Sequence, residues 1–185
     1  WRRSFFHPEQ YEKHGKSIAS VRAGNVIGGG DWALDRIIPD CIKALEAGKE
    51  IEIRSSKAIR PWQHVLEPLS GYMLLALRMW KEPIKYCEGW NFGPRAESIS
   101  TVWDVATKVV ENYGSGQLRD LSDPNTLHEA KLLMLDISKA KFMLGWESRM
   151  DINQTVALTV DWYKRYQEES VYSICVNQIE LYTKK

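Results

Sequence analysis

The stretch SIASVRA at residues 17–23, followed directly by GNVIGGGD at residues 24–31, decides the fold. Its first part alternates loosely between apolar and polar residues, which predicts a strand, and the glycines after it predict a loop. Apolar residues at helical spacing over residues 35–48 then predict a helix that Gly48 ends.

The same patterns extend from this stretch to both ends of the chain. Further strands are predicted at residues 50–54, 89–94 and 131–136, with a brief one inside the loop 59–65. Further helices are predicted at residues 66–80, 100–113, 138–144 and 151–167, with a helical tail after them and a helix end at residues 1–6. The helix at 66–80 is apolar enough to be buried on most sides. Strands alternate with helices, so the predicted fold class is α/β.

Composition excludes several classes of protein. The chain has 185 residues, of which 44% are hydrophobic and 26% are charged, as in ordinary globular domains. Lys and Arg number 25 against 24 Asp and Glu, and this near-neutral balance argues against a nucleic-acid-binding protein. The sequence contains no apolar run long enough to cross a membrane and no signal peptide, so we expect no membrane partner.

Cysteine and histidine usage indicates a reducing compartment and no metal site. Cys41, Cys87 and Cys175 are odd in number and far apart, which predicts neither a disulfide framework nor a zinc site. The four histidines have no metal-binding spacing. We therefore expect a cytoplasmic protein without a metal ion. Cys41, Trp62 and His64 are expected in the core.

The glycines at residues 28–30 resemble a dinucleotide-binding fingerprint, but the local chemistry argues against that function. A fingerprint loop places backbone N–H groups at a helix N-terminus against a pyrophosphate, and Asp31 would set a negative charge there. Pro39 predicts that the next helix begins near residues 35–38, several positions too late. We expect a loop that borders a site instead of a phosphate cradle.

A few polar residues are candidates for ligand binding. Arg60 precedes Pro61, which keeps its backbone extended and directs a planar guanidinium suited to phosphate, although the sequence alone favours a surface Arg paired with a carboxylate. Asn25 follows the first strand, where α/β folds bind ligands, or it forms a turn. Glu129, next to His128, either accepts hydrogen bonds from a ribose or lies in solvent.

Catalytic groups are not recognisable in the chain. There is no GxSxG motif, no SxxK motif, no phosphate-binding P-loop and no Tyr-x-x-x-Lys pair in a suitable helix. The sequence therefore predicts binding groups and no catalytic residue.

Seven stretches together resemble the CDP-glucose 4,6-dehydratases, which are NAD-dependent nucleotide-sugar enzymes of the extended short-chain dehydrogenase/reductase family. They are SVRAGNVIGGGDW at residues 20–32, DRIIPD at 35–40, IRPWQHVLEPLSGY at 59–72, EGWNFGP at 88–94, HEA at 128–130, DISKAK at 136–141 and LGW at 144–146. The resemblance runs from the first residue to the last helix.

This resemblance implies that the chain is the C-terminal portion of such an enzyme. The end of a Rossmann-like parallel sheet, a remnant of the NAD-binding domain, would occupy residues 1–35, and a smaller α/β domain that binds the sugar nucleotide would occupy residues 36–185. The family's NAD loop and catalytic Tyr and Lys would precede the chain, which would then be inactive alone. The intact protein would convert CDP-glucose to CDP-4-keto-6-deoxyglucose and water for dideoxysugar and surface-polysaccharide synthesis, as a homo-oligomer.

Nine site residues follow from the same resemblance. The substrate would contact Asn25, Arg36, Ile37, Ile53, Arg60, His128 and Glu129, and the cofactor would lie against Gly24 and Val26. Two alternatives stay open: another nucleotide-sugar epimerase, dehydratase or decarboxylase of the family, and a non-catalytic module that binds a nucleotide sugar.

Overall fold

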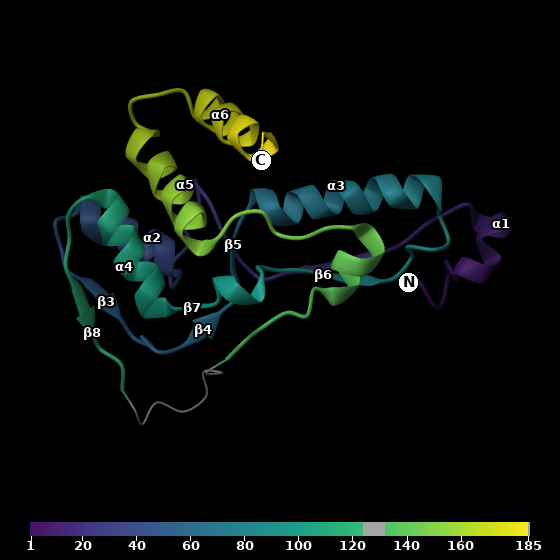
Figure 1. Ribbon diagram of the computed structural model, residues 1–185, viewed down its shortest axis with the longest axis horizontal. Helices are drawn as coiled ribbons and strands as arrows, with labels where there is room; N and C mark the ends of the chain where they lie inside the picture. The colour runs from purple at the N-terminus through teal and green to yellow at the C-terminus, as the bar shows by residue number, and fades with distance from the viewer. Residues whose placement is uncertain (124–131, 185) are drawn as a thin grey trace.

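A computed structural model gives the structure of the protein and describes residues 1–123 and 132–184 (Figure 1). The helices are α1 (Tyr11–His14), α2 (Ile37–Glu46), α3 (Leu66–Lys81), α4 (Val102–Tyr113), α5 (Ile152–Arg165) and α6 (Val171–Thr183), with shorter helical turns at Pro8–Gln10, Ala96–Ser98 and Ala140–Leu144. The strands are β1 (Ser20–Ala23), β2 (Asn25–Ile27), β3 (Ile51–Ile53), β4 (Ile59–Arg60), β5 (Trp62–His64), β6 (Gly89–Phe92), β7 (Ser100–Thr101) and β8 (Leu118–Asp120).

The strands form two-stranded pairs, most of them parallel. β1 pairs with β6, β2 with β5 and β3 with β8, all in parallel, whereas β4 and β7 are antiparallel. Parallel neighbours require a crossover between them, and the chain supplies helices for that purpose. The predicted α/β class with parallel, Rossmann-like pairing is confirmed.

Two hydrophobic clusters hold these elements together. The larger one joins α2, α4 and α5 to β2, β3 and β5, with Cys41, Ile42, Val105 and Val156 fully buried. The smaller one joins α3 and β6 to the turn Ala140–Leu144. In Figure 1, α3 runs above β6 on one side of the molecule, and α2, α4 and α5 gather on the other. The core position predicted for Cys41 is confirmed.

Local sequence explains where α4 and α5 begin. Thr101 caps α4 by accepting a hydrogen bond from the Asp104 backbone N–H, and the Asp104 carboxylate accepts one from the Thr101 backbone in return. Asp151 and Gln154 form the same reciprocal arrangement at the start of α5. Each of these two capping arrangements satisfies backbone N–H groups that the first turn of a helix leaves without partners.

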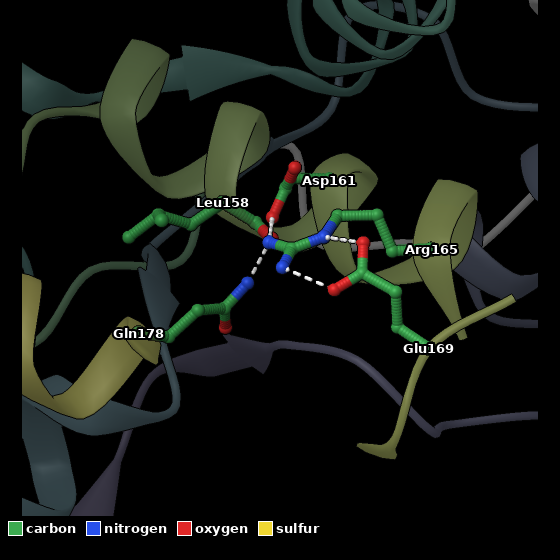
Figure 2. Close-up of polar contacts among 5 residues, drawn as sticks. All are labelled: Leu158, Asp161, Arg165, Glu169 and Gln178. Carbon is green, nitrogen blue, oxygen red and sulfur yellow. Dashed lines mark hydrogen bonds and ion pairs between the residues drawn. The ribbon is translucent and has the colours of Figure 1, made fainter. Parts of the chain in front are cut away.

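Helix α6 returns along α5 and is joined to it by polar contacts (Figure 2). The Gln178 side chain of α6 donates a 2.8 Å hydrogen bond to the Leu158 carbonyl of α5. One turn away, the Arg165 guanidinium pairs with Asp161 at 3.0 Å and with Glu169 at 2.7 Å. The predicted helical tail is thus α6, and these contacts fix the end of α5.

The loop predicted at residues 24–31 contains strand β2, because Asn25–Ile27 pair with β5. Three further predicted elements differ from the structure. Residues 1–6 form a single turn instead of a helix end, because Trp1 and Phe5 are exposed and no packing supports a helix there. Helix α3 is not buried on most sides: Met73 is 69% exposed and Trp80 is 87% exposed. Of the strand predicted at 131–136, the described residues form one bridge, between Leu132 and Ile59, since the side chains that follow are about half exposed.

Candidate functional site

A cavity of about 960 Å³ opens where β2, β3 and the start of α2 converge. Seven of the nine predicted site residues line it, namely Gly24, Asn25, Val26, Arg36, Ile37, Ile53 and Arg60. His128 and Glu129 lie outside the described residues. Residues predicted from separate stretches therefore share one cavity, and their role in binding stays a prediction.

The β2–β5 pair sets one wall of the cavity. Asn25 is the first residue of β2 and lies opposite Trp62 of β5, and its backbone N–H donates a 2.9 Å hydrogen bond to the Pro61 carbonyl. A Cβ on Gly24 would come within 2.3 Å of the same carbonyl oxygen, so only glycine fits at this turn. This close approach brings Gly24 and Asn25 to the cavity edge.

Arg60 enters the cavity from strand β4. Its residue is only 9% exposed, and its guanidinium donates a 2.9 Å hydrogen bond to the Ile59 carbonyl. It also lines a second, smaller cavity of about 250 Å³ together with Pro61 and Met134. Arg60 therefore contributes to the lining of both cavities.

Two further arginines lie in the cavity wall, each paired with a carboxylate. Arg36 contacts Asp31 at 3.0 Å, and Arg54 contacts Asp35 at 2.6 Å. Both carboxylates belong to the loop 28–36, and Asp35 has a positive φ of 59°, a strained backbone for a residue other than glycine. The second pair thus ties this loop to the end of β3.

Asp40 adds another carboxyl group to the cavity lining. Partial burial raises the pKa of Asp40, and the nearby Asp35 carboxylate adds to the rise while Lys43 opposes it. An anion bound close to Asp40 would favour its protonated form further.

Part of the cavity lining is apolar. Ile53 and Trp62 are buried, and Trp62 Nε1 has no hydrogen-bond partner among the residues that the structure describes. Trp62 and His64 are both buried, as predicted, and burial lowers the pKa of His64 to about 4. A lining that combines apolar side chains with arginines suits a ligand with a flat apolar part and an anionic part.

Among the residues that the structure describes, none of those lining the cavity is a His, Cys, Lys or Tyr. Asp31, Asp35, Asp40 and Arg54 belong to the lining without having been predicted as site residues. Arg54 carried a usable signal, because it ends a predicted strand, the same position that singled out Asn25.

The glycines at 28–30 do not open a helix. Helix α2 begins at Ile37, within the range expected from Pro39, so the described residues contain no phosphate cradle of the fingerprint type. Gly29 instead lies against the ring of Trp162. The loop borders the cavity, as expected.

Comparison with known proteins shows what the chain is similar to. It is 49% identical over 175 residues to the CDP-glucose 4,6-dehydratase of Salmonella typhimurium, a match that covers 95% of this chain and 49% of that protein. The chain therefore resembles the CDP-glucose 4,6-dehydratases over almost all of its own length, as predicted. It spans about half the length of this curated relative. No family model matches the chain.

Solved structures of nucleotide-sugar enzymes share the fold of this chain. The dTDP-glucose 4,6-dehydratase of Bacillus anthracis, solved with NAD, superposes with a TM-score of 0.67 at 18% identity, covering 87% of this chain and 49% of that one. The UDP-glucuronic acid 4-epimerase of Bacillus cereus, solved with UDP-glucuronic acid and NAD, gives a TM-score of 0.67 at 20% identity, covering 84% and 48%. None of the described helices of this chain is long and apolar enough to cross a membrane.

Proposed function

We propose that the protein carrying this chain is a CDP-glucose 4,6-dehydratase, which converts CDP-glucose to CDP-4-keto-6-deoxyglucose and water. The chain supplies the part that binds the nucleotide sugar. The observation that carries this proposal is the convergence of seven predicted site residues on one cavity, in a chain 49% identical to such an enzyme.

The charges and apolar side chains of the cavity support the ligand contacts that the family resemblance implies. The diphosphate lies against Arg60 and Arg36, because guanidinium groups form paired hydrogen bonds with phosphate oxygens. Ile53 lines the cavity with an apolar side chain and packs against the cytosine, as an apolar wall does for a flat base. Asn25 contacts the sugar and diphosphate, and Ile37 presents its backbone near the phosphates at the start of α2.

Two residues outside the described part complete the substrate site. His128 and Glu129 belong to it, with Glu129 accepting hydrogen bonds from the ribose. Like the other assignments, this one follows from the family resemblance and the residue chemistry.

NAD, when bound, supplies the hydride acceptor that this dehydration requires. Gly24 and Val26, which both line the cavity, border its nicotinamide. The described residues hold no dinucleotide cradle, so the rest of the NAD site lies outside them. Residues 1–35 form the end of the NAD-binding domain and residues 36–185 the substrate domain, which accords with β1 having one strand partner in the described structure.

The chain alone has no activity under this proposal, because the described cavity lining contains no Tyr or Lys of the kind that family members use. The intact protein acts in the cytoplasm as a homo-oligomer, in dideoxysugar synthesis for surface polysaccharide.

The test is turnover by the protein expressed from its complete open reading frame. CDP-glucose is expected to give a product lighter by one water, and UDP-glucose and dTDP-glucose are expected to react poorly. A 4-epimerase, favoured by the superposition on UDP-glucuronic acid 4-epimerase, would give a product of unchanged mass. Binding of CDP-glucose with no turnover would instead support the binding module.

A further inference from the structure

The loop 28–36 lies between the candidate site and helix α5. Gly28, Asp31 and Arg36 line the cavity from this loop, whereas no residue of α5 does. The opposite side of the loop packs against three aromatic residues at the C-terminal end of α5: Trp162 and Tyr163 of the helix, and Tyr166, which directly follows it. We call these three residues the aromatic clamp.

The most direct contact of the aromatic clamp is a hydrogen bond from Tyr163. Its hydroxyl donates to the backbone carbonyl of Asp31 at 2.6 Å, across 132 positions of the sequence. Tyr163 is buried, and this burial raises the pKa of its hydroxyl to about 12, so the group remains a donor at neutral pH. The bond fixes the loop at the residue where it turns toward the cavity.

Ring contacts hold the loop on either side of Asp31. A Cβ on Gly29 would lie 2.0 Å from the Trp162 ring, so the glycine backbone rests directly on the indole. Trp162 is stacked on Tyr166 with centroids 5.3 Å apart and planes 3° from parallel. Trp32 meets the Tyr163 ring edge-on at 5.2 Å.

Asp31 connects the aromatic clamp to the candidate site. Its side chain accepts hydrogen bonds from the Ala33 backbone and from the Arg36 guanidinium, each at 3.0 Å. The carbonyl that Tyr163 holds and the carboxylate that holds Arg36 thus belong to one residue. A shift of the Asp31 backbone changes where the Arg36 guanidinium lies in the cavity.

We propose that Tyr163 is a positioning residue of the nucleotide-sugar site, which acts through Asp31 to hold Arg36 where it meets the diphosphate. The inference rests on the proposed function, because that function supplies the ligand. A loop held in its binding geometry before the ligand arrives loses less conformational freedom on binding. Tyr163 itself touches neither substrate nor cofactor.

The test compares Tyr163→Phe with the wild type in the protein expressed from its complete open reading frame. Calorimetric titration with CDP-glucose is expected to show about a fivefold rise in Kd, the equivalent of about 1 kcal/mol for one hydrogen bond. KM should rise by a similar factor with kcat unchanged, and amide hydrogen exchange over residues 28–36 should accelerate without ligand. Gly29→Ala, which pushes the loop off Trp162, should act in the same direction. The exposed Tyr172→Phe is the matched control and should change nothing.

Several results would overturn the proposal. One is an unchanged Kd in Tyr163→Phe, with or without faster exchange of the loop. Another is faster exchange throughout α5 and the core, which would make the role of Tyr163 merely structural. A fall in kcat at constant KM would also overturn the proposal. If the wild type neither binds nor converts CDP-glucose, the proposed function fails and Arg36 loses its assigned ligand, whereas failure of the variant alone leaves the proposed function standing.

Discussion

The Tyr182 hydroxyl near the end of the chain donates a 2.9 Å hydrogen bond to the carboxylate of Glu67 in the first turn of α3. Glu67 is fully buried, and its other carboxylate oxygen accepts the backbone N–H groups of Arg149 and Met150 at 2.9 and 2.7 Å. Ser70 joins the network through a 2.9 Å contact with the Tyr182 hydroxyl. One buried carboxylate thus fixes α3, α6 and the segment before α5 to one another.

Removal of this carboxylate should destabilise the protein strongly. We expect Glu67→Ala to lower the free energy of unfolding by about 3 kcal/mol, because it leaves buried donors without an acceptor. Tyr182→Phe removes one of these bonds and should cost about 1 kcal/mol. Urea denaturation measures both, with Tyr172→Phe as the exposed control. Equal, small losses for Glu67→Ala and the control would contradict the structural role of the network.

His64 should make the stability of the protein depend on acid pH. Burial lowers the pKa of His64 from its usual 6.5 to about 4, and its Nδ1 accepts a 3.3 Å hydrogen bond from the Leu66 N–H. Between these two values the unfolded chain binds the proton and the folded one does not. The stability that comes from keeping His64 neutral is therefore fully present above the pKa that His64 has in the unfolded chain. It is lost as the pH falls toward the pKa that His64 has in the folded protein.

The size of this effect follows from the difference between the two pKa values. When the pH falls from about 7 to about 5, the free energy of unfolding should decrease by about 2 kcal/mol because of His64. His64→Asn keeps an acceptor near Leu66 but cannot titrate, so its stability should fall less over that interval. Denaturation of both proteins at the two pH values gives the comparison. Identical pH dependence would show that His64 is not buried in its neutral form.

Periodicity and turn chemistry were enough to predict most elements of the fold. The helix expected at residues 35–48 is α2, and the capping residues Thr101 and Asp151 stand where the helices at 100–113 and 151–167 were expected to start. The exposure of α3 could not be predicted in this way. The spacing of the apolar residues in α3 indicates that one face of the helix packs against another element, but the spacing does not identify that element.

The candidate site was predictable in its residues and not in its contacts. Asn25 and Arg60 were singled out by their chemistry and by the neighbouring strand or proline, and the other candidates by family resemblance. The ion pair between Arg54 and Asp35 joins residues 19 positions apart, and the Tyr163 bond to Asp31 spans 132. Such contacts depend on how α2 and α5 pack, which local sequence patterns do not encode.

Asp35 should weaken the binding of a diphosphate. Its carboxylate pairs with Arg54 at 2.6 Å in the cavity wall, so an anionic ligand meets a like charge there. Asp35→Asn removes that charge and suits the positive φ of 59°, which asparagine adopts readily. We expect a tighter Kd for CDP, by less than about tenfold because the pair is exposed. Glu168→Gln, an exposed charge outside the cavity, should leave Kd unchanged in the same titration. Weaker binding in Asp35→Asn would mean that the carboxylate serves the loop more than it repels the ligand.

Arg60 should contribute most of the charge that holds the diphosphate. It is the most buried of the three cavity arginines, and a guanidinium shielded from water binds phosphate more strongly than an exposed one. We expect Arg60→Ala to raise the Kd for CDP-glucose at least about thirtyfold, which corresponds to about 2 kcal/mol. Arg60→Lys keeps the charge but loses the planar fork, so its Kd should fall between those of Arg60→Ala and the wild type.

Arg119→Ala removes an exposed arginine of β8 that does not line the cavity and is the control for net charge. Melting temperatures of all three variants show whether each remains folded, and a folded Arg60→Ala with wild-type affinity would remove Arg60 from the site.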